Sequence, residues 1–205
     1  TDTINLLQPL ANKESLKESR NRLESKINET VQTEGMTQQS VENYNQTKIK
    51  AQNESSIAQT LIDNGDASDQ EVSTEIEKLN QKLSELTNSI NHLTVNKEPL
   101  ETAKNQLQAN IDQKPSTDGM TQQSVDAYQN AKREAQNESN TALALINNGD
   151  ATEQQITTEK DRVNQQTTNL TQAINGLTVN KEPLETAKTA LQNNIRSEEH
   201  TSELQ

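Results

Sequence analysis

Apolar residues recur along this chain at steps of three and four, the spacing that places them on one face of an α-helix. The most regular series alternates strictly between four and three, as in coiled coils. It consists of Val72, Ile76, Leu79, Leu83, Leu86, Ile90 and Leu93. Polar residues fill the positions between them, so the pattern predicts a long helix with one narrow apolar stripe.

The same pattern returns later in the chain together with its sequence. GMTQQSV at residues 35–41 reappears at 119–125, and VNKEPLETAK at 95–104 reappears at 179–188, both at an offset of 84 residues. A fixed offset indicates tandem repeats of one structural unit. We therefore predict an incomplete module at 1–11, full three-helix modules at 12–95 and 96–179, and the first helix of another module at 180–195.

Within each module the apolar steps predict three helices. The first covers about 14–28 and 97–112, and the second covers 38–63 and 122–147. The third begins with capping boxes at Ser68–Glu71 and Thr152–Gln155, in which side chains and backbone N–H groups satisfy each other. We expect N-caps at Asn12, Asn96, Thr37 and Thr121, and left-handed helix ends at Asn64-Gly65 and Asn148-Gly149.

Two further details concern the third helix. In the second copy Lys160 and Thr167 replace Ile76 and Leu83, so we expect a looser stripe there, with the Lys160 ammonium reaching solvent. The join at 93–97 is short and lacks glycine, which predicts that the third helix runs nearly straight into the next module. The sequence thus predicts an all-α fold of tandem antiparallel three-helix bundles that form an elongated rod.

Composition narrows the class of protein. Only 28% of the residues are hydrophobic and 1% aromatic, against a usual apolar share of about 45–50%, so any core is thin and built from Leu, Ile, Val and Ala. A net charge of −12 without basic clusters argues against nucleic-acid binding. The absence of cysteine excludes disulfides and thiol chemistry. No apolar run approaches the length of a membrane span.

The last ten residues differ from the rest. Residues 196–205 (RSEEHTSELQ) match nothing in the repeat and resemble the in-frame translation of a short-read sequencing adapter. We interpret them as a non-native tail. The segment shows neither a signal peptide nor a sorting signal, so we expect the targeting elements of the parent protein to lie elsewhere.

Few residues suggest chemistry. His92 has Gly176 as its counterpart, so we expect a solvent-facing residue instead of a ligand. The loop at 63–66 carries oxygen ligands but lacks EF-hand spacing, which favours helix capping over calcium. Tyr44 and Tyr128 lie on the apolar face and are predicted to pack in the core. We predict no enzyme, no catalytic, cofactor-binding or metal-binding residues, and no cofactor.

Several short sequence motifs resemble those of a known family. GMTQQSV, the Asn-Gly-Asp-Ala turns at 64–67 and 148–151, and AINGL at 173–177 resemble the FIVAR module. Over residues 1–195 the repeat also resembles those of giant staphylococcal cell-wall proteins. The resemblance implies a cell-surface, wall-associated protein that contacts neighbouring repeats, adheres to host extracellular matrix such as fibronectin and resists osmotic stress. It transfers no residue-level binding motif.

Three functional hypotheses follow. The first is a structural spacer that also acts as an adhesin, the second is a passive stalk with no ligand, and the third is an intracellular coiled-coil scaffold, which requires self-association. Function has to be argued from a site, and the sequence displays none. We therefore favour a mainly mechanical role.

The rod has a direct test in small-angle X-ray scattering. A compact globule of this length has a radius of gyration of roughly 17 Å. Because modules joined end to end spread their mass along one axis, we expect a clearly larger value and a pair-distance distribution with a long tail. A symmetric, compact distribution would contradict the rod.

Overall fold

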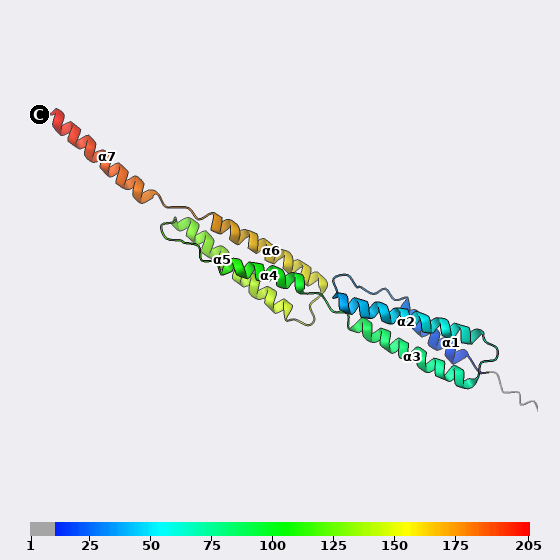
Figure 1. Ribbon diagram of the computed structural model, residues 1–205. Coiled ribbons are helices and arrows are strands. Elements are labelled where there is room, and N and C mark those ends of the chain that lie inside the picture. The colour runs from blue at the N-terminus through cyan, green and yellow to red at the C-terminus, as the bar shows by residue number, and fades with distance from the viewer. Residues whose placement is uncertain (1–10) are drawn as a thin grey trace, which may run out of the picture. The chain divides into compact units, whose positions relative to one another are not determined.

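The computed structural model describes residues 11–205, so all but one residue of the predicted module at 1–11 lie outside the described part. The described residues form an all-α fold, as predicted, and divide into one unit that ends at Asn96 and a second that begins at Lys97 (Figure 1). The helices are α1 (Glu14–Ile27), α2 (Gln38–Asp63) and α3 (Asp69–Asn91) in the first unit, and α4 (Glu98–Ile111), α5 (Gln122–Ile146), α6 (Glu153–Asn175) and α7 (Glu182–Glu203) in the second.

Three helices pack against one another in each unit. The large core side chains come mainly from the first and third helices of a unit. Examples are Leu16 and Leu23 of α1 and Leu79 of α3, all at most 1% exposed. Apart from Tyr44 near its start, the second helix contributes the small residues Ala51, Ser55 and Ala58, so the helices approach closely. The core of the first unit is Ala11, Leu16, Leu23, Ile27, Tyr44, Ala51, Ala58, Ala67, Val72, Leu79 and Leu86. From Leu16 onward, every one of these has a buried counterpart in the second unit.

The predicted caps of the second and third helices are confirmed. Thr37 Oγ1 accepts the backbone N–H of Ser40 at 3.3 Å. Both capping boxes form: Ser68 Oγ accepts from the Glu71 backbone N–H at 3.2 Å, and Glu71 accepts from the Ser68 N–H at 2.8 Å. That backbone hydrogen bond lowers the pKa of Glu71. These bonds satisfy N–H groups that the first helical turn leaves without partners.

The first helices begin differently from the prediction. Lys13 and Lys97 are the N-caps, in place of Asn12 and Asn96, and neither makes a side-chain cap bond to its own helix. Each lysine reaches instead across the bundle, and Lys97 Nζ donates to the carbonyls of Ile146 at 2.8 Å and Asn148 at 2.6 Å. A cation at a helix C-terminus satisfies carbonyls that the helix leaves open. Asn12 Oδ1 still accepts one backbone N–H, that of Glu14.

The prediction of left-handed helix ends is wrong. Among the described residues, positive φ occurs only at Gly35 (74°) and Gly119 (71°), in the loops before α2 and α5. The turns after these helices close by another route, because Asn64 Oδ1 accepts the backbone N–H of Asp66 and Asn148 makes the equivalent bond. An asparagine side chain that bonds two residues ahead imitates a turn and removes the need for a left-handed residue.

The third helix does not run straight into the next module. α3 ends at Asn91, and in the following segment Val95 forms an antiparallel bridge with Met36. The bonds on either side run from Thr37 N–H to Thr94 O at 2.7 Å and from Asn96 N–H to Gly35 O at 2.8 Å. The left-handed Gly35 thus supplies one of the backbone partners that hold the segment extended. We call this contact the clamp; the second unit repeats it between Met120 and Val179.

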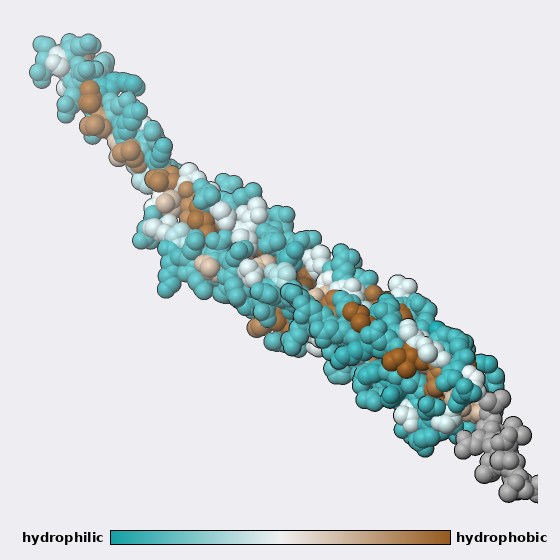
Figure 2. Space-filling view, turned by 45° about the vertical axis from the view of Figure 1, so that its right-hand side comes forward, coloured by the Kyte–Doolittle hydropathy of each residue, from teal (hydrophilic) through white to brown (hydrophobic). Residues whose placement is uncertain are grey.

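The last helix, α7, lacks the partners that its counterparts have. Its residues Leu184, Leu191 and Ile195 are 70%, 61% and 48% exposed, whereas the equivalent positions of α1 and α4 are buried. Figure 2 shows this apolar stripe in brown along the terminal helix. The helix continues to Glu203, past the predicted end at 195, because the tail contains neither the proline nor the glycine that follows α4.

Glycine substitutions test the two turn assignments against each other. An L-residue in the left-handed region costs about 1–2 kcal/mol, and Gly119 has open space where a Cβ would lie. We therefore expect Gly119→Ala to lower the free energy of unfolding by about 1 kcal/mol in urea denaturation. The control is Gly149→Ala, which has equal space and ordinary φ, so it should change stability by a few tenths at most. Equal effects of the two variants would contradict the assignment.

Candidate functional site: a groove repeated in both units

Each unit contains a groove between the end of its second helix and the start of its third. The groove of the first unit has a volume of about 460 Å³ and is lined by α2 and α3, with Ile57 and Leu61 on one side and Thr74, Glu75 and Lys78 on the other. The groove of the second unit has about 500 Å³. Its lining residues are Thr141, Ala144, Leu145, Asn148, Gln154, Gln155, Thr158, Glu159 and Arg162. Every one is the equivalent, one repeat later, of a lining residue in the first unit, so the groove is a property of the repeat.

A glutamate lies in the wall of each groove. Glu75 is 4% exposed and Glu159 is 3% exposed, although glutamate is rarely buried without a partner. Each shares a hydrogen bond with a half-buried glutamate of the preceding helix, Glu54 or Glu138. We call each set, Glu54 with Glu75 and Glu138 with Glu159, a carboxyl pair. One oxygen each of Glu54, Glu75 and Glu159 is buried without a hydrogen-bond partner.

This environment favours the protonated acid. Burial, followed by the hydrogen bond and the charge of Glu54, raises the pKa of Glu75 from 4.5 to about 7. Burial, followed by Glu138, raises the pKa of Glu159 to about 8. Two carboxylates this close cannot both ionise without a large electrostatic cost. The pair with Glu159 therefore retains a proton in most molecules at neutral pH, and the pair with Glu75 does so in about half of them.

The chain's own cations compensate only in part. Lys78 and Arg162 lower the pKa of the nearby glutamate, yet less than the other influences raise it. Arg162 Nη1 lies 3.9 Å from Glu159 Oε2, and the arginine side chain is 66% exposed. These two residues stand at the rims of the grooves. The buried oxygens deeper in the wall are left without a positive partner.

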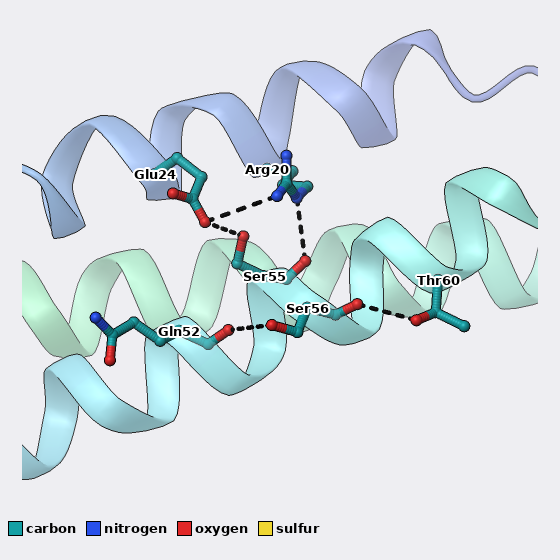
Figure 3. Close-up of polar contacts among 6 residues, drawn as sticks. All are labelled: Arg20, Glu24, Gln52, Ser55, Ser56 and Thr60. Carbon is teal, nitrogen blue, oxygen red and sulfur yellow. Dashed lines mark hydrogen bonds and ion pairs between the residues drawn. The ribbon is translucent and has the colours of Figure 1, made fainter.

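A separate polar contact positions the second helix. Ser55, next to Glu54 in α2, is 1% exposed and donates from its hydroxyl to Glu24 Oε1 of α1 (Figure 3). Arg20 Nε donates to the Ser55 carbonyl at 3.1 Å, and Arg20 lies 3.9 Å from Glu24. Successive helical residues point about 100° apart, so a serine held against α1 turns its neighbour Glu54 toward α3. In the second unit Ser139 donates to the neutral Gln108 at 3.0 Å.

The residues singled out from sequence lie apart from the groove. Tyr44 and Tyr128 are in the core, at 5% and 7% exposure, as predicted. His92 is exposed at the end of α3, with Nδ1 2.6 Å from the Asn88 carbonyl. Lys160 is half-buried. Within residues 11–205 no group of three or more acidic, histidine or cysteine side chains is placed to hold a metal ion.

Sequence reasoning missed the carboxyl pairs because the four-three pattern predicts an apolar stripe narrower than the face that the third helix buries. The four-three series assigned Ile76 to the stripe, yet Glu75 is the more buried residue, and Ser89 is buried beside Leu86. A helix that contacts two neighbours buries a broader face than a two-stranded seam. One signal was present: Glu54 and Glu75 both recur unchanged one repeat later.

Comparisons with known proteins add a family and several relatives. The FIVAR domain family matches residues 19–87 and 103–171. "Extracellular matrix-binding protein EbhB" of Staphylococcus aureus strain Newman and "Extracellular matrix-binding protein ebh" of strain NCTC 8325 are each 42% identical over 98% of this chain. EbhB of strain N315 is 40% identical over the same share. The chain spans only 2–5% of the length of these relatives. No solved structure matches.

None of the helices in the described part of the chain is both long enough and apolar enough to cross a bilayer.

The carboxyl pairs predict a pH dependence of stability. An unfolded glutamate loses its proton near pH 4.5, whereas folded Glu75 and Glu159 keep theirs to about pH 7 and 8. The folded state thus binds more protons in this window, and stability falls as pH rises through it. We expect the free energy of unfolding of each structural unit to drop by about 1–3 kcal/mol in total between pH 5 and pH 8.

The variant Glu75→Gln with Glu159→Gln keeps the size and hydrogen bonding of the side chains while removing the titration. Its stability should stay level across this window and exceed that of the unmodified chain at pH 8. Thermal and urea unfolding followed by circular dichroism measure both quantities. A parallel pH profile in chain and variant would contradict the role of the carboxyl pairs. The variant leaves the other nearby charged residues unchanged. These are Glu54 and Lys78, and on the far side of Ser55 they are Arg20 and Glu24.

Proposed function

Because the chain belongs to the FIVAR domain family, we propose that it is a non-catalytic repeat segment that spaces and adheres at the bacterial cell surface. The coarse part of this statement, a repeat segment of a cell-surface protein, rests on family membership and on relatives along 98% of the chain. The finer part names the ligand. We propose host extracellular matrix, with fibronectin as the protein to test, and a contribution to resistance against osmotic stress.

One observation carries the spacer role: the same polar contacts recur within each unit. The first unit closes with the clamp at Val95, and the second starts with Lys97, which caps the end of α5. The stability of such an array is close to a sum over its units. We therefore propose modules at 12–95 and 96–179 that unfold separately under load, followed by the first helix of a third module at 180–195 and a non-native tail.

The adhesive role is supported by the names of the relatives, which describe matrix binding, and by the groove that recurs in both units. Repetition matters here because a partner that contacts equivalent sites on several modules gains effective concentration. A weak site in one module then suffices. The passive stalk is the outcome that the following experiment sets against adhesion.

Binding of the 205-residue chain to immobilised human fibronectin decides between adhesion and a passive stalk. We expect a saturable signal with an affinity on the order of 1–100 μM per site, weakened by added salt because the chain is acidic. Immobilised serum albumin serves as the reference surface. No saturable signal at micromolar concentration would leave the spacer role and remove the adhesive one for this segment.

A further inference from the structure

We infer that the groove in each unit binds a basic side chain, lysine or arginine, of a partner polypeptide, with the cation seated against Glu75 in the first unit and Glu159 in the second. This inference rests on the proposed adhesive function and deepens it, because it names the chemistry of the partner. It is carried by three observations: buried acids with open oxygens, a groove with apolar walls, and the recurrence of both in the two units.

The buried acids supply the attraction. Glu75 and Glu159 are more than nine-tenths buried, line the grooves, and each has one carboxyl oxygen without a hydrogen-bond partner. A buried polar oxygen that lacks a partner costs free energy, and a buried carboxylate costs more unless a cation accompanies it. A partner's ammonium or guanidinium supplies hydrogen-bond donors and positive charge together. It can therefore replace the proton that each carboxyl pair retains.

The grooves fit the shape of a long basic side chain. Ile57, 52% exposed, and Leu61 form an apolar wall in the first unit. In the second unit Thr141 stands in place of Ile57, and Ala144 and Leu145 supply the apolar part of the wall. Lysine and arginine cover apolar surface with their methylene stems while the charged end seeks a polar partner. Volumes of about 460 and 500 Å³ also leave room for the residues that flank it in a partner.

The residues at the rims do not occupy this place. The side chain of Arg162 is 66% exposed, and its Nη1 lies 3.9 Å from Oε2 of Glu159. The other oxygen of Glu159 is the one without a partner. In the first unit Lys78 has the smallest influence among those that act on the pKa of Glu75. A cation that enters through the groove therefore competes with the shared proton of the carboxyl pair for a buried oxygen that the rim residues do not bind.

A basic side chain suits these sites better than a metal ion. Calcium takes six to eight oxygen ligands, whereas a carboxyl pair brings two side chains, and no third acidic or histidine residue in residues 11–205 completes a metal group. A guanidinium matches a carboxylate with two parallel N–H bonds. The net charge of −12 also draws a basic partner toward the surface.

The probe for this site is the peptide acetyl-Leu-Arg-Leu-amide, titrated into the isotopically labelled 205-residue chain and followed by NMR. We expect chemical-shift changes around both grooves, with a dissociation constant on the order of 1 mM. Because the cation replaces a proton, binding should be several-fold tighter at pH 8 than at pH 6. The matched control peptide carries citrulline, which has nearly the shape of arginine without its charge, and should bind at least tenfold more weakly.

Protein variants locate the site. The double variant Glu75→Gln with Glu159→Gln should bind the arginine peptide at least tenfold more weakly than the unmodified chain. Retained helicity in circular dichroism shows that the variant folds. The control, Glu77→Gln with Asp161→Asn, removes the same number of carboxyl groups from exposed equivalent positions of α3 and α6 and should leave binding unchanged. Equal binding of the citrulline peptide, or equal losses in the two variants, would overturn the inference.

Three further outcomes separate this inference from the proposed function. Shifts at both carboxyl pairs with calcium chloride, and none with the arginine peptide, would overturn the basic-side-chain site in favour of a metal. Saturable fibronectin binding that persists in Glu75→Gln with Glu159→Gln would overturn the site and leave adhesion in place. Peptide binding at both grooves without fibronectin binding would support the site and reject fibronectin as the partner.

Discussion

The structure of each unit depends on how closely its helices can approach when so few large apolar residues are available. Ala51, Ser55 and Ala58 of α2 present a face with almost no side-chain volume, so leucines from α1 and α3 can fill the space between backbones. Close packing of this kind provides dispersion contacts between the helices. In a wider core, large aromatic side chains would be needed to make these contacts. The hydroxyl of Ser55 is tolerated there only because Glu24 accepts its hydrogen bond.

A thin core makes the polar contacts at the ends of the bundle important. Lys97 binds carbonyls at the end of α5, and the clamp at Met120 and Val179 ties the loop before α5 to the segment after α6. The carboxyl pairs act in the opposite direction, since their burial weakens the folded state once they ionise. Strongly shifted acids of this kind cluster at functional sites of proteins.

The sequence predicted the features that depend on near neighbours. The helices and capping boxes follow from residues at most four positions apart, so the repeat and its periodicity were enough to place them. The features that were wrong or missed depend on distant partners. Lys13 contacts Ile62, 49 positions away. Gly35 accepts a hydrogen bond from the backbone beyond α3, and Glu75 shares a hydrogen bond with Glu54 of α2. Local propensity contains no information on these pairings; only the exact recurrence of the residues hinted at them.

The boundary between Asn96 and Lys97 has a consequence for how such an array changes in length. Asn96 donates its backbone N–H back to Gly35 of the first unit, and Lys97 donates to the Ile146 carbonyl of the second. Unequal recombination that adds or removes one repeat of 84 residues at this point would leave both kinds of contact in every remaining unit. A gene built from this repeat could therefore lengthen or shorten by unit steps while every remaining bundle stays complete.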